Sequence, residues 1–248
     1  MARLDIIIPV FNEGENIIRV LDTFRDSVRT PFRVLICYDR DDDNTLPAVE
    51  AYPERSSLDV LFVKNRSQGP HAAVMTGFQQ STAPYVLVYP ADDTDNAGRI
   101  DQLVEQAERG CDIVVASRFI KGGCMVGAPP LKGFLVRTAA FTLHHGARLP
   151  VRDASNGLRL FSRRVIDQIA VESTSGFCYS IELLVKCHRL GWPIGEVPFV
   201  WYERKAGQSR FRVLKWVPKY LRWYFYAFAT TWLGARSVKM KTPRTASV

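Results

Sequence analysis

Three aspartates stand together where an apolar segment ends, and their spacing is typical of a site for a metal ion or a diphosphate. Asp92 and Asp93 follow the segment Tyr85–Tyr89, and Asp95 lies two residues further on. Carboxylate oxygens are the ligands that Mg²⁺ and Mn²⁺ prefer, and a divalent cation neutralises the charge of a diphosphate. The alternative is an acidic turn that caps the next helix, because acidic residues are common at strand ends.

A second acidic loop, residues 39–44, follows another apolar segment. It reads Asp-Arg-Asp-Asp-Asp-Asn and lacks the glycine and the distal glutamate of an EF-hand calcium loop. In α/β nucleotide sites, an acidic residue near the end of the second strand recognises the ribose. We therefore expect Asp39 to contact the base or ribose of a nucleotide.

Alternating strand and helix patterns position these loops. Apolar, β-branched runs predict strands at residues 4–10, 32–38, 58–63, 85–89 and 113–117, and helical spacing predicts helices at 15–28, 69–80 and 99–109. Single helices between strands imply βαβ units and a mostly parallel sheet. Ligands bind beyond the carboxyl ends of such strands, where Asn12, Glu13, Asp39, Asp92 and Arg118 fall.

The second half of the sequence is less regular. It predicts a helix at residues 131–148, strand character at 192–201 and a helix at 211–233. No change in composition marks a second independent domain. The predicted fold class is therefore α/β, with one domain over residues 1–210 and an amphipathic helix after it.

Charge and cysteine usage narrow the class of protein. The 248 residues carry a net charge of +8, yet residues 201–248 hold eleven basic residues and one acid, Glu203. Such a basic end suggests nucleic acid or an anionic membrane surface as the partner. The five cysteines form no CxxC pair, which favours reduced thiols over disulfides or a zinc site. The apolar run at residues 6–11 is short for a signal peptide, so we expect a cytoplasmic protein.

The basic end contains an amphipathic segment, residues 211–235, followed by a basic tail, residues 236–248. Arg212, Lys215, Lys219 and Arg222 recur at steps of three and four, so they share one helical face. The charge-free stretch 223–233 is shorter than the ~20 residues of a membrane-spanning helix. A helix that lies in the membrane interface fits this pattern, and packing on the catalytic domain or on a dimer partner is the alternative.

Taken in order, these segments resemble glycosyltransferase family 2, which has the GT-A fold. Within that family they look like the dolichyl-phosphate and polyprenyl-phosphate sugar synthases. The segments that carry the resemblance run in collinear order over residues 4–210: Ile8–Ile17, Asp39–Thr45, Ala91-Asp92, Ala116–Phe119 with Gly122-Gly123, Asp153–Arg159, Gly176-Phe177 with Glu182, Gly195–Pro198 and Arg204–Ser209.

The resemblance implies a single Rossmann-like GT-A domain and an inverting transfer, in which the acceptor oxygen attacks the anomeric carbon as the nucleoside diphosphate leaves. The donor would be GDP-mannose or a UDP-hexose, and the acceptor a polyprenyl phosphate at the cytoplasmic membrane face. The residues implied to bind the nucleotide sugar are Pro9, Phe11, Asn12, Glu13, Asp39, Asp92 and Asp93. The metal, Mg²⁺ or Mn²⁺, would be held by Asp92 with Asp93.

An anionic lipid phosphate needs cations rather than a general base. The residues expected to hold it are Arg118, Arg137, Arg204 and Ser209, and we expect Asp92, Arg118 and Arg204 to be the catalytic ones. Arg137 could equally be a surface charge of its helix. The four histidines share no ligand spacing and are interpreted as structural.

Two residues depart from the family pattern. Tyr38 stands where the second motif usually has its first acid, and Pro90 stands where the metal motif usually opens with aspartate. They leave open a catalytically silent protein that binds nucleotide sugars. A family 2 transferase with a soluble glycan or other acceptor is a further alternative, which the basic aromatic helix argues against. A homodimer is also left open. A nucleic-acid partner is not expected, because no recognised binding motif accompanies the basic residues.

Overall fold

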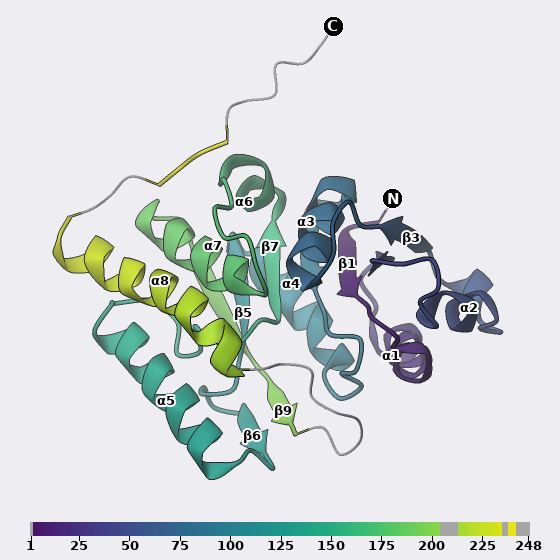
Figure 1. Ribbon diagram of the computed structural model, residues 1–248, viewed down its shortest axis with the longest axis horizontal. Helices are drawn as coiled ribbons and strands as arrows, with labels where there is room; N and C mark the ends of the chain where they lie inside the picture. The colour runs from purple at the N-terminus through teal and green to yellow at the C-terminus, as the bar shows by residue number, and fades with distance from the viewer. Residues whose placement is uncertain (1, 204–212, 235–237, 242–248) are drawn as a thin grey trace, which may run out of the picture.

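The computed structural model describes residues 2–203, 213–234 and 238–241, and of residues 213–217 only the backbone. Within these residues a seven-stranded sheet forms the centre of the molecule (Figure 1). Its strands are β1 (Leu4–Pro9), β2 (Phe32–Tyr38), β3 (Val60–Lys64), β4 (Tyr85–Val88), β5 (Ile113–Ser117), β7 (Arg159–Ser162) and β8 (Ile194–Pro198). A separate parallel pair consists of β6 (Cys124–Val126) and β9 (Val200–Tyr202).

The order of the strands in the sheet is β3-β2-β1-β4-β7-β5-β8. β7 runs antiparallel to both β4 and β5, and the other described pairings in this sheet are parallel. The predicted α/β fold with a mostly parallel sheet is therefore confirmed. β7 is not among the predicted strands, because only two of its four residues, Leu160 and Phe161, are apolar.

Helices cover both faces of the sheet. The helices are α1 (Gly14–Ser27), α2 (Thr45–Glu50), α3 (Pro70–Gln80), α4 (Ile100–Glu108), α5 (Pro130–His145), α6 (Arg163–Gln168), α7 (Cys178–Arg189) and α8 (Val213–Trp232), with 3-10 turns η1 (Arg55–Ser57) and η2 (Ala97–Arg99). The short helix α2 is absent from the prediction. The predicted strand character at residues 192–201 divides at Phe199, since β8 and β9 belong to different sheets.

Alternation along the strands produces two apolar cores. In β1, Ile6 and Ile8 face a core with α1 and α4, whereas Ile7 faces a core with α3 and α7. Because successive side chains of a strand point to opposite faces, a continuous apolar run is what a strand covered on both faces requires. The strands are thereby fixed, and the loops at their carboxyl ends are brought to one edge.

α8 packs on the domain through one face. Trp223 and Ala227 are buried against the core that contains α7. Beneath Trp223 the buried Lys186 donates to Glu182 and Glu172, each at 2.6 Å, and its Nζ lies 5.3 Å from the centre of the Trp223 ring. One face of α8 therefore packs on the rest of the domain, as the alternative to a membrane-interface helix predicted. Within the described residues, none of the helices has both the length and the apolar character needed to cross a bilayer.

Candidate active site

The loop after β1 is held by the loop after β2. Asn12 adopts a left-handed backbone conformation, with φ of 54°, which asparagine tolerates better than most residues. Three successive backbone N–H groups donate to side chains of the second loop: Asn12 to Asp43 at 3.1 Å, Glu13 to Thr45 at 3.0 Å and Gly14 to Asn44 at 3.0 Å. Asp43 is buried. Part of the acidic loop therefore supports the neighbouring loop.

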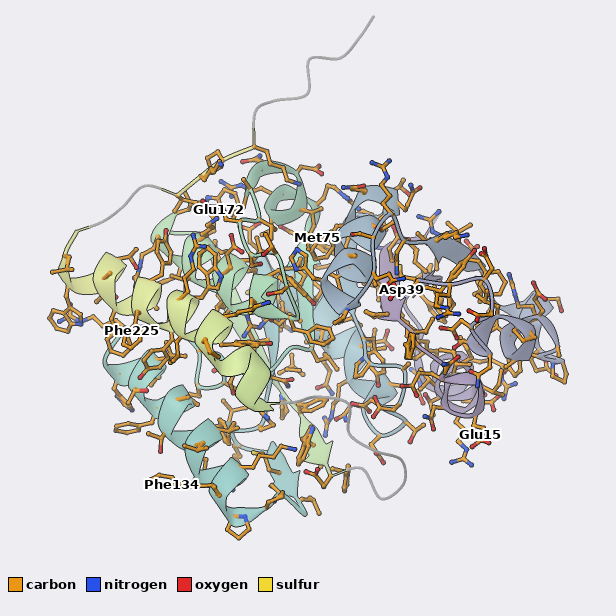
Figure 2. The ribbon with its side chains drawn as sticks, in the orientation of Figure 1. Glu15, Asp39, Met75, Phe134, Glu172 and Phe225 are labelled. Carbon is orange, nitrogen blue, oxygen red and sulfur yellow. The ribbon has the colours of Figure 1, made fainter. Side chains whose placement is uncertain are left out.

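Asp39, labelled in Figure 2, joins the end of β2 to the loop before α3. Its carboxylate accepts hydrogen bonds from Asn65 Nδ2 and from the Gly69 backbone N–H, both at 2.8 Å. Gly69 has a φ of 99°, a conformation that favours glycine. Both oxygens of Asp39 thus have partners within the protein, and they fix the loop that leads into α3.

A cavity of about 160 Å³ lies between the first two loops. It is lined by Phe11, Asn12, Arg40, Asp42 and Asp43. Phe11 is 44% exposed and lies beside polar groups. Flat aromatic rings of nucleobases stack on the faces of aromatic side chains. A larger open hollow of about 690 Å³ includes Arg3 and Thr30, which lie at the amino ends of the strands, away from the loops described above.

The loop after β4 carries the aspartates of the predicted metal site. Asp93 Oδ1 accepts from the backbone N–H groups of Asp95 and Asn96, both at 3.0 Å, and Asn96 Nδ2 lies 3.0 Å from each carboxylate oxygen. Burial raises the pKa of Asp93, although these hydrogen bonds oppose the rise. Asp93 therefore holds its own turn together, and both Asp92 and Asp93 are half-buried.

Asn96 links this turn to β9. Its Nδ2 donates to the Val200 carbonyl at 2.9 Å, and its Oδ1 accepts from the Val200 N–H at 3.1 Å. The last described residues before the segment that holds Arg204 and Ser209 are thereby tied to the aspartate loop. Sequence analysis did not single out Asn96, because an asparagine in an acidic turn gives no sign of a partner about a hundred residues away.

No group of three or more His, Cys, Asp or Glu side chains in the described part of the chain is arranged to hold a metal ion. Mg²⁺ is usually bound by one or two carboxylates together with water and substrate phosphates. A carboxylate such as Asp92 at a strand end fits that mode of binding. It does not fit a metal enclosed by protein ligands alone.

Arg118 lies at the carboxyl end of β5 in a buried ion pair. Its Nε and Nη2 donate to Asp153 at 2.7 and 2.8 Å, and Nη2 also donates to Ser155 at 2.7 Å. Burial disfavours the charge of Asp153, but the hydrogen bonds and charge of Arg118 outweigh it and lower the pKa of Asp153. Among the described residues, Nη1 of Arg118 makes no hydrogen bond, and the guanidinium carbon lies 5.3 Å from the centre of the Phe119 ring.

The loop that holds Asp153 is braced on two sides. Glu196 of β8 accepts from the Asp153 N–H at 3.2 Å, and Asn156 donates to the Ala116 carbonyl at 2.6 Å. The fully buried Arg159 donates to the carbonyls of Ala154 and Ser180. Three of the sequence motifs thus contact one another, and their shared effect is to fix Arg118.

The other predicted acceptor residues stand apart from this cluster or outside the structure. Arg137 is exposed on α5, and no contact among the described residues joins it to Arg118. Arg204 and Ser209 lie outside the described residues. His144 Nδ1 lies 2.9 Å from the Leu149 carbonyl, and burial lowers the pKa of His71, whose ring lies 6.3 Å from that of Tyr179. The structural interpretation of these two histidines stays a prediction.

Known proteins resemble this chain over most of its length. The family model described as "Glycosyl transferase family 2" matches residues 5–170. The undecaprenyl-phosphate mannosyltransferase of Micrococcus luteus is 29% identical over 240 residues, which cover 93% of this chain and 96% of the relative. The polyprenol monophosphomannose synthase of Mycolicibacterium smegmatis is 26% identical over 213 residues, covering 83% of this chain and 79% of the relative.

Solved structures agree on the fold. Glucosyl-3-phosphoglycerate synthase from Mycobacterium tuberculosis, crystallised with Mn²⁺, UDP and glucosyl-3-phosphoglycerate, aligns with a TM-score of 0.64 at 18% identity. The alignment covers 93% of this chain and 80% of that chain. The same enzyme has been crystallised with Mg²⁺ and UDP, at a TM-score of 0.62 and 18% identity over 93% of this chain and 79% of that one.

Proposed function

The chain belongs to glycosyl transferase family 2, and we propose that it moves a hexose from a nucleotide-sugar donor to a polyprenyl phosphate at the cytoplasmic face of a membrane. The observation that carries the proposal is the convergence of three features at one edge of the sheet. These are the aromatic cavity at Phe11, the carboxylate of Asp92 and the fixed guanidinium of Arg118. The base would then lie at the loops after β2 and β1, the diphosphate at the loop after β4, and the acceptor phosphate at the end of β5.

The donor nucleotide occupies the cavity beside Phe11. The base stacks on the exposed Phe11 ring, and Asp39 orders the loop on the far side of the ribose. Pro9, Asn12 and Glu13 complete the nucleotide site, because the loop that contains them is locked by Asp43. A preformed loop of this kind lowers the entropy cost of binding.

The diphosphate lies over the loop after β4. Asp92 would hold a divalent cation, Mg²⁺ or Mn²⁺, which would supply the positive charge that offsets the leaving diphosphate. Asp93 stabilises the turn that presents Asp92. The solved complexes of the related fold with Mn²⁺ or Mg²⁺ and UDP support this assignment. Pro90 does not prevent it, since the substrate phosphates and water supply the remaining ligands.

The acceptor phosphate faces Arg118. A lipid phosphate is anionic near neutral pH, so its oxygen can attack the anomeric carbon without a general base, with inversion of configuration. Nη1 of Arg118 donates to the phosphate and orients its attacking oxygen toward the anomeric carbon. Arg137, Arg204 and Ser209 are the further residues that we propose to bind the acceptor. The names of the two curated relatives, one an undecaprenyl-phosphate and one a polyprenol enzyme, support a polyprenyl acceptor and mannose as the sugar.

A donor panel tests the proposal. Purified protein is incubated with Mg²⁺ or Mn²⁺, undecaprenyl phosphate or dolichyl phosphate in detergent, and each labelled donor in turn, GDP-mannose and the UDP-hexoses included. We expect a chloroform-soluble, acid-labile product that depends on the metal ion and forms fastest with GDP-mannose. Product in the aqueous fraction alone would assign the protein to a soluble acceptor. Binding of nucleotide without product from any donor would identify a silent binding protein.

A further inference from the structure

Asn96 uses its whole amide group to join two parts of the site. The residue is 4% exposed. Of the two hydrogens on Nδ2, one serves the Asp93 carboxylate at 3.0 Å and the other the Val200 carbonyl at 2.9 Å. Oδ1 accepts from the Val200 N–H at 3.1 Å, so the amide bonds Val200 as a neighbouring strand would. One side chain therefore attaches the loop after β4 to β9, across 104 positions of the sequence.

Phe199, the residue before Val200, continues this connection to the end of β5. Its N–H donates to the Ser117 carbonyl at 2.9 Å, and its carbonyl accepts from the Cys124 N–H at 3.1 Å. Ser117 is the last residue of β5 and directly precedes Arg118. The pair β6 and β9 is thereby held at the carboxyl end of β5 (Figure 1). A chain of contacts thus runs from the loop after β4, through β9, to the residue before Arg118.

Close packing leaves this connection little freedom. Phe199 and Ser117 are both buried. A Cβ atom at Gly123 would lie 2.3 Å from the Ser117 carbonyl oxygen and 3.1 Å from the Arg118 Cα, so only glycine fits there. Because packed interiors transmit displacements, a shift of β9 would have to move the backbone of Arg118 as well.

The turn that presents Asp92 does not depend on the Asn96 side chain. Asp93 Oδ1 also accepts from the backbone N–H groups of Asp95 and Asn96, both at 3.0 Å, and these two bonds remain without an amide at position 96. The two bonds to Val200, by contrast, come from the amide alone. What the amide adds is therefore the attachment between the two parts of the site.

We propose that Asn96 is a positioning residue that sets the place of Arg118 relative to the loop carrying Asp92. The inference rests on the proposed function, in which Asp92 faces the donor diphosphate and Arg118 the acceptor phosphate. The two substrates are held by different loops, so their separation depends on how those loops are joined. Because a displacement of about 1 Å can lower a rate about 100-fold, hydrogen bonds that fix this separation act on the rate without touching either substrate.

Kinetics of Asn96→Ala and Asn96→Leu separate positioning from binding. Leucine keeps the branched shape of asparagine but forms no hydrogen bond. For both variants we expect kcat for transfer to undecaprenyl phosphate to fall about 10- to 100-fold. We expect KM for the donor, and the Kd of UDP or GDP with Mn²⁺ measured by calorimetry, to stay within about threefold, as for a residue that acts in the transition state rather than in binding.

Asp101→Ala is the matched control. Asp101 lies on α4 and, like Asn96, bonds backbone groups far along the chain, since it accepts from the N–H groups of Arg29 and Thr30 at 3.0 and 2.9 Å. Arg29 and Thr30 precede β2, at the amino ends of the strands. The control should lower the melting temperature as the Asn96 variants do. It should leave kcat within about twofold, because distant sites without shared partners act independently.

An NMR measurement tests the connection without donor, metal or acceptor. The Nε–H of Arg118 is buried and donates to Asp153 at 2.7 Å, so it should give a separate signal, which is identified by its loss in Arg118→Lys. In the isotope-labelled full-length protein we expect this signal to move by more than its line width in both Asn96 variants. It should stay in place in Asp101→Ala.

The possible outcomes are distinct. An unchanged Arg118 signal in both Asn96 variants, or a kcat within about twofold of wild type, would overturn the proposal. Loss of Mn²⁺ and nucleotide binding in proportion to kcat would do the same, because it would confine Asn96 to the loop after β4. A wild-type protein that makes no lipid-linked product would reject the proposed function, and a displaced Arg118 signal would then still support the connection through Asn96.

Discussion

The carboxylate of Asp153 receives two hydrogen bonds from the guanidinium of Arg118, at 2.7 and 2.8 Å, and a third from the Arg118 backbone N–H at 2.9 Å. Asp153 is fully buried, and Arg118 nearly so. Asp153 therefore fixes both the backbone and the side chain of the residue that we place at the acceptor phosphate. If Arg118 holds the acceptor phosphate as proposed, the motif that contains Asp153 acts on the reaction through Arg118.

The first prediction concerns the loss of the ion pair between Arg118 and Asp153. Asp153→Asn leaves the Arg118 charge buried and uncompensated, which should lower the free energy of unfolding by about 3–5 kcal/mol. Urea denaturation followed by circular dichroism measures the change. Asp167→Asn is the control, since Asp167 lies 3.9 Å from Arg163 in an exposed i,i+4 pair. Its removal should cost less than about 0.5 kcal/mol. Equal effects of the two variants would contradict the role given to Asp153.

The second prediction is the pH dependence of that effect. Arg118 holds the pKa of Asp153 below its ordinary value in the folded state. The stabilisation is then fully present above the pKa of an unfolded aspartate, and it is lost as pH falls through the lower folded pKa. The difference in unfolding free energy between wild type and Asp153→Asn should stay constant from pH 7 to about 5 and shrink below about pH 4. A difference in unfolding free energy between wild type and Asp153→Asn that grows as the pH falls would contradict the lowered pKa of Asp153.

The third prediction separates the aspartates after β4. Asp92→Asn keeps the shape of the side chain and removes its charge, so the transfer rate should fall by roughly 100-fold or more, because a bound cation supplies several kcal/mol of charge stabilisation. Asp95→Asn removes a neighbouring exposed charge and should leave the rate within about twofold. Both are measured at saturating donor over a range of Mn²⁺ concentrations. An active Asp92→Asn enzyme would place the metal site elsewhere.

The fourth prediction concerns the loop lock at Asp43. Asp43→Ala removes the acceptor of the Asn12 N–H and leaves a polar group without a partner, at a cost of about 1–3 kcal/mol. Since this loop lines the cavity beside Phe11, we expect binding of UDP and GDP, measured by calorimetry, to weaken about tenfold. Asp41→Ala is the control, because Asp41 forms an exposed ion pair with Lys64 at 2.5 Å and does not line the cavity. Nucleotide binding that is unaffected by Asp43→Ala would contradict the lock.

The sequence predicted the framework well because the strands that build it carry strong local signals. β1, β2 and β5 are largely apolar, with Asp5 and Arg33 as the charged residues of the first two. The polar residues beyond the ends of β2, β4 and β5 mark the edge where Asp39, Asp92 and Arg118 lie. The ordered motifs predicted the family, which the family match confirms. Fold and family were therefore accessible from residue type and order alone.

Residue type and order alone did not predict which contacts each site residue makes. Asp92 and Asp93 are chemically identical and adjacent, yet only the folded turn commits Asp93 to Asn96. Likewise Arg118 was predicted as a phosphate ligand, and its pairing with Asp153 spans 35 positions. Such long-range contacts depend on strand order, and strand order depends on β7, which has no apolar pattern of its own.

The place of β7 also bears on how the protein is made. β4 and β5 follow one another in the chain but do not pair, since β7 inserts between them from residues 159–162. A nascent chain adds about 5–20 residues per second, so for some seconds the edges of β4 and β5 wait for a strand not yet synthesised. Open edges of this kind invite pairing with other chains. Assembly of the second half of the sheet should thus be the slow and aggregation-prone stage of folding, and a chaperone that shields nascent strands should raise the yield of this enzyme.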